Sequence, residues 1–243
     1  MSKITATLID HMGSDLSVVN AARVSFGKKS SMDGDNMGVW HLKDKDKKLI
    51  GYLAKHKHLS PFGHAFASFH VKAPIFVARQ LVKHKFLRWN EISRRYVDDQ
   101  PEFYVPDVWR GRSADKKQGS DAEVAIDVTW YDRDDGYNSW PEDSYFIALE
   151  AYQKMLELGV APEQARMVLP QSTMTEWYWS GSLDAFADMC KLRCAPDSQY
   201  ESRVVADQIS EVMGDLFPVS WASLVGKAVR DAHKRSDENA GGE

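Results

Sequence analysis

Hydrophobic and polar residues alternate with a period of two along residues 65–72, which read AFASFHVK. One face of this stretch carries alanine, phenylalanine and valine, whereas the other carries Phe66, Ser68, His70 and Lys72. This alternation is typical of a half-exposed β-strand. Residues 4–9, ITATLI, predict a further strand at the start of the chain.

Longer stretches show helical spacing or carry residues that begin and end helices. Pro74 suits the first turn of a helix, because the N–H that proline lacks has no partner there. Gly159 stands where a helix would end, and Ser198 and Glu201 have the spacing of a capping box. Helices are therefore predicted over residues 14–26, 47–56, 74–86, 144–158, 162–170, 182–193 and 198–214.

Three polar segments lie between or after these elements. Residues 28–46 are rich in Lys, Asp and Gly, which predicts a mobile connection. Residues 107–143 have little periodicity, so they predict a long surface insert rather than a linker between two cores. Residues 235–243 predict a frayed tail. The whole pattern predicts a helix-rich α+β chain of mixed α/β content that forms a single domain over residues 1–243.

Composition allows a sizeable core and limits the partners. The chain has 243 residues, 43% of them hydrophobic, and a formal net charge of −4. This acidic balance gives no general reason to expect nucleic acid or an anionic membrane as a partner. No apolar run approaches the roughly 20 residues of a membrane span, and the N-terminus lacks the pattern of a signal peptide, so we expect a cytoplasmic location. Cys190 and Cys194 are expected to be reduced, half-buried structural residues, without a second pair to complete a zinc site.

The cationic side chains gather in residues 79–95, where six of them accompany a single acid, Glu91. An anionic ligand is expected at such a local excess of positive charge. On a continuous helix Lys83 and Lys85 would point about 200° apart. Either the helix ends at this point, or the two lysines serve different partners.

The spacing of the polar residues in this stretch suits a phosphate. Gln80, Lys83 and His84 share one helix face. Charge-assisted donors of this kind bind phosphate oxygens, and the Ser93 hydroxyl and the Arg95 guanidinium would add oriented donors.

Three other interpretations of the basic stretch stay open. It could be a solvated helix face, or it could bind nucleic acid through Phe86 and Trp89 as stacking platforms. Against the second, the stretch is short and Glu91 would repel a phosphate backbone. The third is a metal site, although no carboxylate or further histidine recurs at a recognised zinc or iron spacing. The histidines considered are His56, His58, His64, His70 and His84.

The order of these residues resembles that of the flavin-dependent thymidylate synthases. The family signature is Arg-His-Arg, seven residues and then Ser, and the matching residues here are Lys83, His84 and Lys85, seven residues and then Ser93. Further blocks follow the family's order from about residue 5 to 215. These blocks are AARVSF (21–26), HLSPFGHAFASFHVKAPIFVARQ (58–80), NEISRRY (90–96), ARMVLP (165–170) and LRCAPDSQYE (192–201).

The resemblance implies an enzyme that methylates dUMP at C5 to give dTMP. Methylenetetrahydrofolate would supply the carbon, and FAD reduced by NADPH would supply the hydride. It also implies a homotetramer with active sites at subunit contacts, and a fold with a central mixed sheet. The chain has no GxGxxG sequence, so a flavin held in a Rossmann turn is not expected.

The resemblance assigns roles residue by residue. Arg193 would stabilise negative charge on the pyrimidine and so activate C5, and no cysteine nucleophile is implied. His58 would position a folate or relay a proton, or it is a capped loop residue. The implied catalytic residues are Arg193, Ser93 and His58; those for dUMP are Gln80, Lys83, Glu91, Ser93, Arg95, Arg166 and Arg193; those for FAD are Ser60, Lys83, His84, Lys85, Asn90, Glu91, Ser182 and Asp188.

The sequence departs from the family pattern around the flavin. Both signature arginines are lysines, which keep the charge and lose the two-pronged donor. The sequence Ser-Leu-Asp at 182–184 replaces Asn-Ala-Arg, Gly63 replaces a glutamate, and Asp197 replaces a common histidine. These changes leave open a looser FAD, a shifted FAD pose or a reaction on another pyrimidine nucleotide such as dCMP. A non-catalytic nucleotide- or RNA-binding protein also stays open, and the insert could be a lid or a subunit contact.

Overall fold

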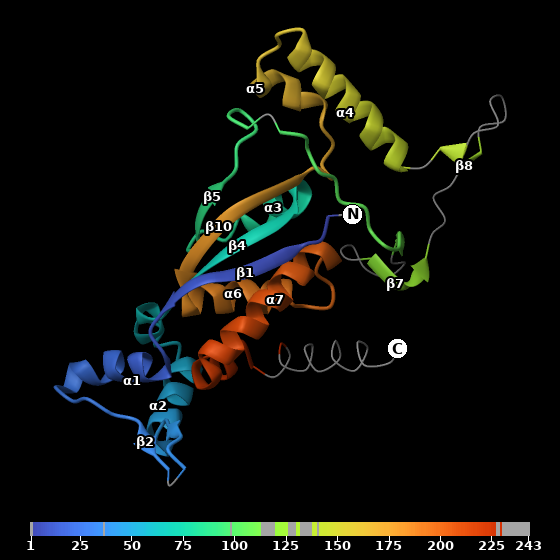
Figure 1. The fold of residues 1–243 in the computed structure, drawn as a ribbon. Helices are drawn as coiled ribbons and strands as arrows, with labels where there is room; N and C mark the ends of the chain where they lie inside the picture. The colour runs from blue at the N-terminus through green and yellow to red at the C-terminus, as the bar shows by residue number, and fades with distance from the viewer. Residues whose placement is uncertain are drawn as a thin grey trace.

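The structure is a computed structural model that describes residues 2–35, 37–97, 99–112, 120–125, 130–131, 138–139, 141–226 and 229. Its centre is a four-stranded sheet in the order β1–β4–β10–β5, shown in Figure 1. The strands are β1 (Thr5–Met12), β4 (Phe66–Pro74), β10 (Met174–Ser182) and β5 (Arg88–Glu91). The helix-rich α+β class is confirmed. All neighbours in this sheet are antiparallel, so the sheet is not the mixed one that the resemblance implied.

Strand β4 follows the predicted alternation. Ala67, Phe69 and Val71 are buried, whereas Ser68 and His70 are half-buried on the opposite face. The strand begins and ends within two residues of the predicted range. Strand β4 is one of the two inner strands of the sheet, and it pairs with β1 on one edge and with β10 on the other.

Strand β10 was missed in the sequence analysis, although its residues also alternate. Trp177 and Trp179 are buried on one face, whereas Tyr178 is exposed on the other. Trp89 of β5 stacks on Trp177, with ring centroids 4.3 Å apart and an interplanar angle of 18°. Offset aromatic stacking of this kind stabilises cross-strand pairs, and here it fixes β5 at the sheet edge.

Helices α6 (Leu183–Arg193) and α7 (Tyr200–Leu216) cover one face of the sheet (Figure 1). Helix α6 confirms its prediction almost to the residue, and Ser182 is its N-cap. Cys190 and Cys194 are unpaired, as expected, but they are buried rather than half-buried. The predicted capping box of α7 is wrong, because the helix begins one residue later with Gln199 as N-cap and no capping side chain.

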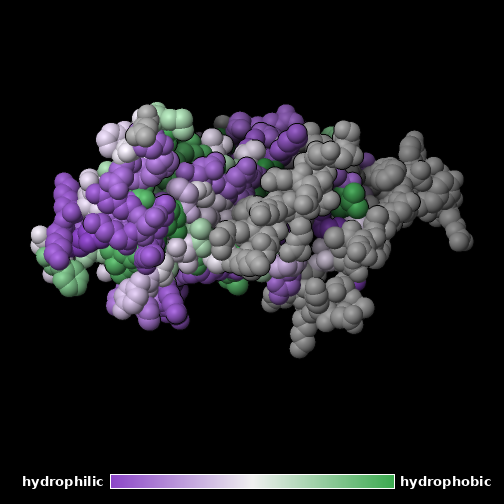
Figure 2. All heavy atoms as spheres, turned by 90° about the horizontal axis from the view of Figure 1, so that it is seen from below, coloured by the Kyte–Doolittle hydropathy of each residue, from purple (hydrophilic) through white to green (hydrophobic). Residues whose placement is uncertain are grey.

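The N-terminal elements form one end of the molecule. They are α1 (Asp15–Arg23), η1 (Val24–Phe26), the hairpin of β2 (Asp33–Gly34) and β3 (Trp40–His41), α2 (Asp44–Lys55) and the 3-10 helix η2 (Ser60–His64). Residues 28–46 thus contain regular elements. A hydrogen bond also connects the two ends of this segment, because the Ser30 hydroxyl donates to buried Asp46 over 2.5 Å. Figure 2 shows this end as predominantly hydrophilic.

Helix α3 (Ile75–Leu81) is shorter than predicted and gives way to turns before β5. The insert contains β6 (Arg110–Arg112), β7 (Ser120–Ala125), β8 (Trp130–Tyr131) and β9 (Asn138–Ser139), and parts of it lie outside the described residues. Helix α4 (Pro141–Glu157), α5 (Pro162–Ala165) and η3 (Arg166–Val168) follow. The predicted tail at 235–243 also lies outside the described residues.

Among the helices that the structure describes, none is both long and apolar enough to span a membrane.

Candidate functional site

A cavity of about 440 Å³ opens where the end of α3 meets the end of α6. Two predicted nucleotide-binding cations, Lys83 and Arg193, face it together with the cation Lys191, and Asp197 is the acid among the lining residues. The site therefore carries an excess of positive charge. The lining residues are Gln80, Lys83, Lys191, Leu192, Arg193, Ala195, Asp197, Ser198 and Gln199.

Arg193 is the last residue of α6, and two of its guanidinium nitrogens donate hydrogen bonds within the chain. Its Nε donates to Nε2 of His84 over 3.1 Å, and its Nη2 donates to the backbone carbonyl of Gln80 over 3.2 Å. Burial lowers the pKa of Arg193, but an arginine this basic stays charged. The guanidinium is thus a fixed cation at the cavity wall.

His84 acts as the acceptor for this arginine. Burial, and next the positive charge of Arg193, lower the pKa of His84 from 6.5 to about 4, while Asp188 acts in the opposite direction. The imidazole is therefore neutral at physiological pH. Since its Nε2 accepts from Arg193, its proton lies on Nδ1.

Lys83 and Lys85 lie on either side of His84 after the end of α3, and both are exposed. Lys83 lines the cavity and Lys85 does not. No ion pair within the described residues neutralises either ammonium group. Of the two alternatives that the spacing of Lys83 and Lys85 leaves open, the first holds, because α3 ends at Leu81, before both lysines.

Gln80 is tied to the start of α7 through its side chain. Its Nε2 donates to Oε1 of Gln199, and its Oε1 accepts from the Ser202 hydroxyl over 3.2 Å. Gln199 in turn donates its Nε2 to Oε2 of Glu201 over 3.1 Å. Gln199, Glu201 and Ser202 were not predicted as site residues, although the QYE sequence falls in a block quoted for the resemblance.

A second group of predicted residues lies on β5 and in the turn after it. Glu91 accepts from Thr175 over 2.7 Å and from the Trp89 indole over 3.1 Å. Arg95 donates its Nε to the Ser93 hydroxyl over 3.1 Å. Neither these residues nor Asn90 line the 440 Å³ cavity.

The remaining predicted residues lie further apart. Arg166, exposed on η3, donates to the carbonyl of Glu163 over 3.2 Å. His58 and Ser60 are exposed and follow α2, a helix at the end of the molecule away from α5 in Figure 1. Asp188 pairs with Lys191 over 2.9 Å, and Ser182 caps α6. Within one chain, the fold brings together Gln80, Lys83, His84 and Arg193, and it leaves the others in separate groups.

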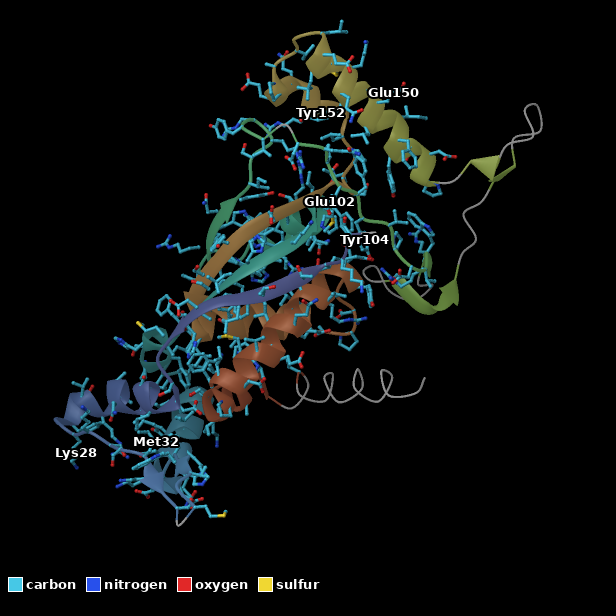
Figure 3. All side chains as sticks on the ribbon, in the orientation of Figure 1. Lys28, Met32, Glu102, Tyr104, Glu150 and Tyr152 are labelled. Carbon is cyan, nitrogen blue, oxygen red and sulfur yellow. The ribbon has the colours of Figure 1, made fainter. Side chains whose placement is uncertain are left out.

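A second cavity of about 290 Å³ shares Gln199 with the first. Arg110 of the insert, Glu201 and several aromatic side chains line it. One of these is Tyr104, which Figure 3 shows on the segment that leads toward β6. Burial, and next the charge of Glu201, raise the pKa of Tyr104 to about 12, so this phenol stays protonated.

The described ranges contain no group of three or more His, Cys, Asp or Glu residues that could hold a metal ion.

Comparison with protein families gives a match over most of the chain. The sequence model of the thymidylate synthase complementing protein family matches residues 7–219. The chain is 39% identical over 221 residues to a flavin-dependent thymidylate synthase of Thermus thermophilus, covering 89% of this chain and 74% of the relative. It is also 39% identical over 218 residues to the flavin-dependent thymidylate synthase of Thermosipho melanesiensis, covering 90% and 89%.

Solved structures give a similar result. The UMP/dUMP methylase PolB of Streptomyces cacaoi, bound with 5-Br dUMP, superposes with a TM-score of 0.73 at 30% identity, covering 94% of this chain and 97% of that one. The same enzyme bound with 5-Br UMP superposes with a TM-score of 0.69 at 31% identity, covering 92% and 94%.

Proposed function

This chain belongs to the flavin-dependent thymidylate synthase family, and from that membership we propose that it methylates dUMP at C5 to give dTMP. The observation that carries the proposal is Arg193, a fixed cation on the wall of a positively charged cavity, held by His84 and Gln80. A further support is the methylase of similar fold that was solved with a brominated dUMP.

In this proposal the chain's residues bind the nucleotide and activate its base. The Arg193 guanidinium stabilises the negative charge that develops on the pyrimidine when C5 attacks the one-carbon unit. His84 accepts from Nε and the Gln80 carbonyl accepts from Nη2, so the other guanidinium N–H groups have no partner among the described residues and can donate to a ligand in the cavity. The residues proposed to hold dUMP are Gln80, Lys83, Glu91, Ser93, Arg95, Arg166 and Arg193.

The proposed flavin contacts fit an anionic, dinucleotide-like ligand. Lys83 and Lys85 are exposed cations that no described acid neutralises, and cations of this kind suit a diphosphate. FAD, when bound and reduced by NADPH, would supply the hydride, and methylenetetrahydrofolate would supply the carbon. His58 is proposed to position the folate. The residues proposed for FAD are Ser60, Lys83, His84, Lys85, Asn90, Glu91, Ser182 and Asp188.

We further propose that the site is completed between copies of the chain in a homotetramer. Ser93 and Arg95, Arg166, and His58 lie in different parts of one chain and do not line the cavity of Arg193. A ligand that contacts all of them would need a second subunit. The single-domain organisation, the cytoplasmic location and the absence of a nucleic-acid partner stay predictions.

Anaerobic turnover tests the proposed reaction. We expect dTMP to form from dUMP in the presence of methylenetetrahydrofolate, NADPH and FAD, and the flavin absorbance to bleach on reduction. Parallel reactions with UMP and dCMP define the pyrimidine and the sugar that the site accepts. A protein that takes up no FAD and yields no methylated nucleotide would refute the proposal.

A further inference from the structure

The surface insert is joined to the candidate site by a continuous series of hydrogen bonds. Arg110 of β6 donates its Nη2 to Oε1 of Glu201, at the first turn of α7. The other oxygen of Glu201 accepts from Gln199 over 3.1 Å, and Gln199 accepts from Gln80. The backbone carbonyl of Gln80 accepts from Arg193. The insert is therefore connected to Arg193, on the wall of the 440 Å³ cavity, through Glu201, Gln199 and Gln80.

Arg110 is held in place on two further sides, by the insert and by α7. Ser120 of the neighbouring strand β7 accepts from the Arg110 Nε over 2.9 Å. The guanidinium also lies over the ring of Tyr200, 4.3 Å from its centroid. Glu201 is only 5% exposed, and the Arg110 guanidinium is the cation that pairs with its buried carboxylate.

Glu201 determines which group donates and which accepts in each hydrogen bond between it and Gln80. A carboxylate can only accept hydrogen bonds, whereas an amide can present either its oxygen or its NH₂ group. Glu201 therefore obliges Gln199 to turn its NH₂ toward the carboxylate and its oxygen toward Gln80. Gln80 must then turn its NH₂ toward Gln199, and its oxygen lies toward Ser202.

We propose that Glu201, held by Arg110 of the insert, is a positioning residue. It fixes the orientation of the Gln80 side-chain amide, that is, where its oxygen and its NH₂ group lie relative to the nucleotide. In the fixed orientation Gln80 keeps one N–H and one oxygen lone pair beyond its described partners, each at a defined place on the cavity wall. If the amide were inverted, its oxygen and its NH₂ group would exchange places. A nucleotide carbonyl that accepts from the N–H of the original orientation would then face an oxygen, with which it cannot form a hydrogen bond. This inference rests on the proposed function, since it takes Gln80 to contact dUMP.

The substitution Glu201→Gln tests the inference with almost no change in shape. The oxygen of the new amide would accept from Arg110, which can only donate, so the new NH₂ group would face Gln199. Gln199 and then Gln80 would have to invert. We expect the dissociation constant of dUMP, measured by calorimetry on the full chain in the presence of FAD, to rise about tenfold, the value of one lost hydrogen bond.

Two further variants separate orientation from stability. In Arg110→Met the buried Glu201 carboxylate loses its ion-pair partner, so this variant is expected to be the least stable of the set. The carboxylate still accepts from Gln199, so the variant is expected to bind dUMP as the wild type does. In the double variant R110M/E201Q either orientation is possible, so its affinity should lie between those of E201Q and the wild type. Glu211→Gln, on the same helix and exposed, is the matched control.

The outcomes are distinct. If the wild type binds no dUMP, the proposed function fails and the inference falls with it. If the wild type binds dUMP and E201Q binds it equally well, the inference alone is overturned, whatever R110M does. If affinity falls in the same order as melting temperature across the three variants, the series is merely structural, and the inference is likewise overturned.

Discussion

Arg193 shows how a fold prepares one side chain for chemistry. Two acceptors of different kinds, an imidazole nitrogen and a backbone carbonyl, hold its guanidinium. The family resemblance predicts Arg193, Gln80, Lys83 and His84 as site residues, and the basic stretch points to the last three. Glu201 and Arg110 cannot be predicted in this way, since an ion pair between residues 91 positions apart leaves no local pattern.

The low pKa of His84 predicts a pH dependence of stability. The unfolded chain binds a proton at this residue near pH 6.5, whereas the folded chain does so only near pH 4. The free energy of unfolding should therefore lose a contribution as the pH falls from about 6.5 toward 4. Urea unfolding at pH 7.5 and pH 5 measures the loss. The loss should be smaller in His84→Asn; an equal loss in both proteins would contradict a neutral, buried imidazole.

The two lysines of the signature predict weak retention of FAD. In the variant with Lys83→Arg and Lys85→Arg, each ammonium becomes a planar two-pronged donor. If one additional hydrogen bond of about 1 kcal/mol forms, the dissociation constant of FAD should fall about fivefold. Quenching of flavin fluorescence measures it, with Lys48→Arg on α2 as the control. Unchanged affinity would argue against placing the flavin at these side chains.

At the scale of elements, local pattern decided what could be predicted. Strand β4 and helix α6 followed from alternation and helical spacing, because each buries one face. Strand β10 alternates equally well, yet it ends in a Ser-Gly dipeptide at 180–181, which is typical of a turn. In the structure the strand runs through this dipeptide and continues directly into α6. Helix α3 ended early because the chain turns to bring His84 against Arg193, a tertiary contact that no local spacing announces.

Gly181 tests the packing of β10 against the turn before β5. A Cβ at this position would lie 2.4 Å from Cδ2 of Leu87, which is buried. Gly181→Ala should therefore lower the free energy of unfolding by about 1–3 kcal/mol. Adding Leu87→Ala should cost less than the two single losses combined, because it removes the clash. Gly51→Ala in α2, where a Cβ meets nothing within 4 Å, is the control and should be slightly stabilising. If the losses in free energy of unfolding caused by Gly181→Ala and Leu87→Ala are strictly additive in the double variant, the predicted contact is refuted.

At the scale of the whole molecule, the predicted site residues are divided among separate parts of one chain. These groups lie at α6, at the turn after β5 and at η3. If they meet in an oligomer, each site depends on two copies, as heterologous or isologous contacts allow. If the oligomer is the proposed homotetramer, light scattering should give the mass of four chains.

Mixed oligomers test this shared site. Arg166→Ala and Arg193→Ala should each abolish most dTMP formation. If the two variants are unfolded, mixed in equal amounts and refolded together, about a quarter of the sites should regain both arginines when each site draws on two copies. Mixing two preparations of Arg193→Ala is the control. No recovery in hetero-oligomers of confirmed mixed composition would place both arginines in the same copy.

The pairing of β4 with β10 also bears on how the chain is made. Strand β4 ends at Pro74, and its neighbour β10 begins at Met174, so β4 lacks its longest partner until about 100 further residues have left the ribosome. Closing so large a loop is entropically costly and slow. During that interval the hydrogen-bonding edge of β4 is open to wrong partners. Translation speed and chaperones are thus expected to influence the yield of folded protein. Changes in the length of the insert, which lies inside this loop, are expected to influence that yield less, because the cost of closing a loop grows only slowly with its length.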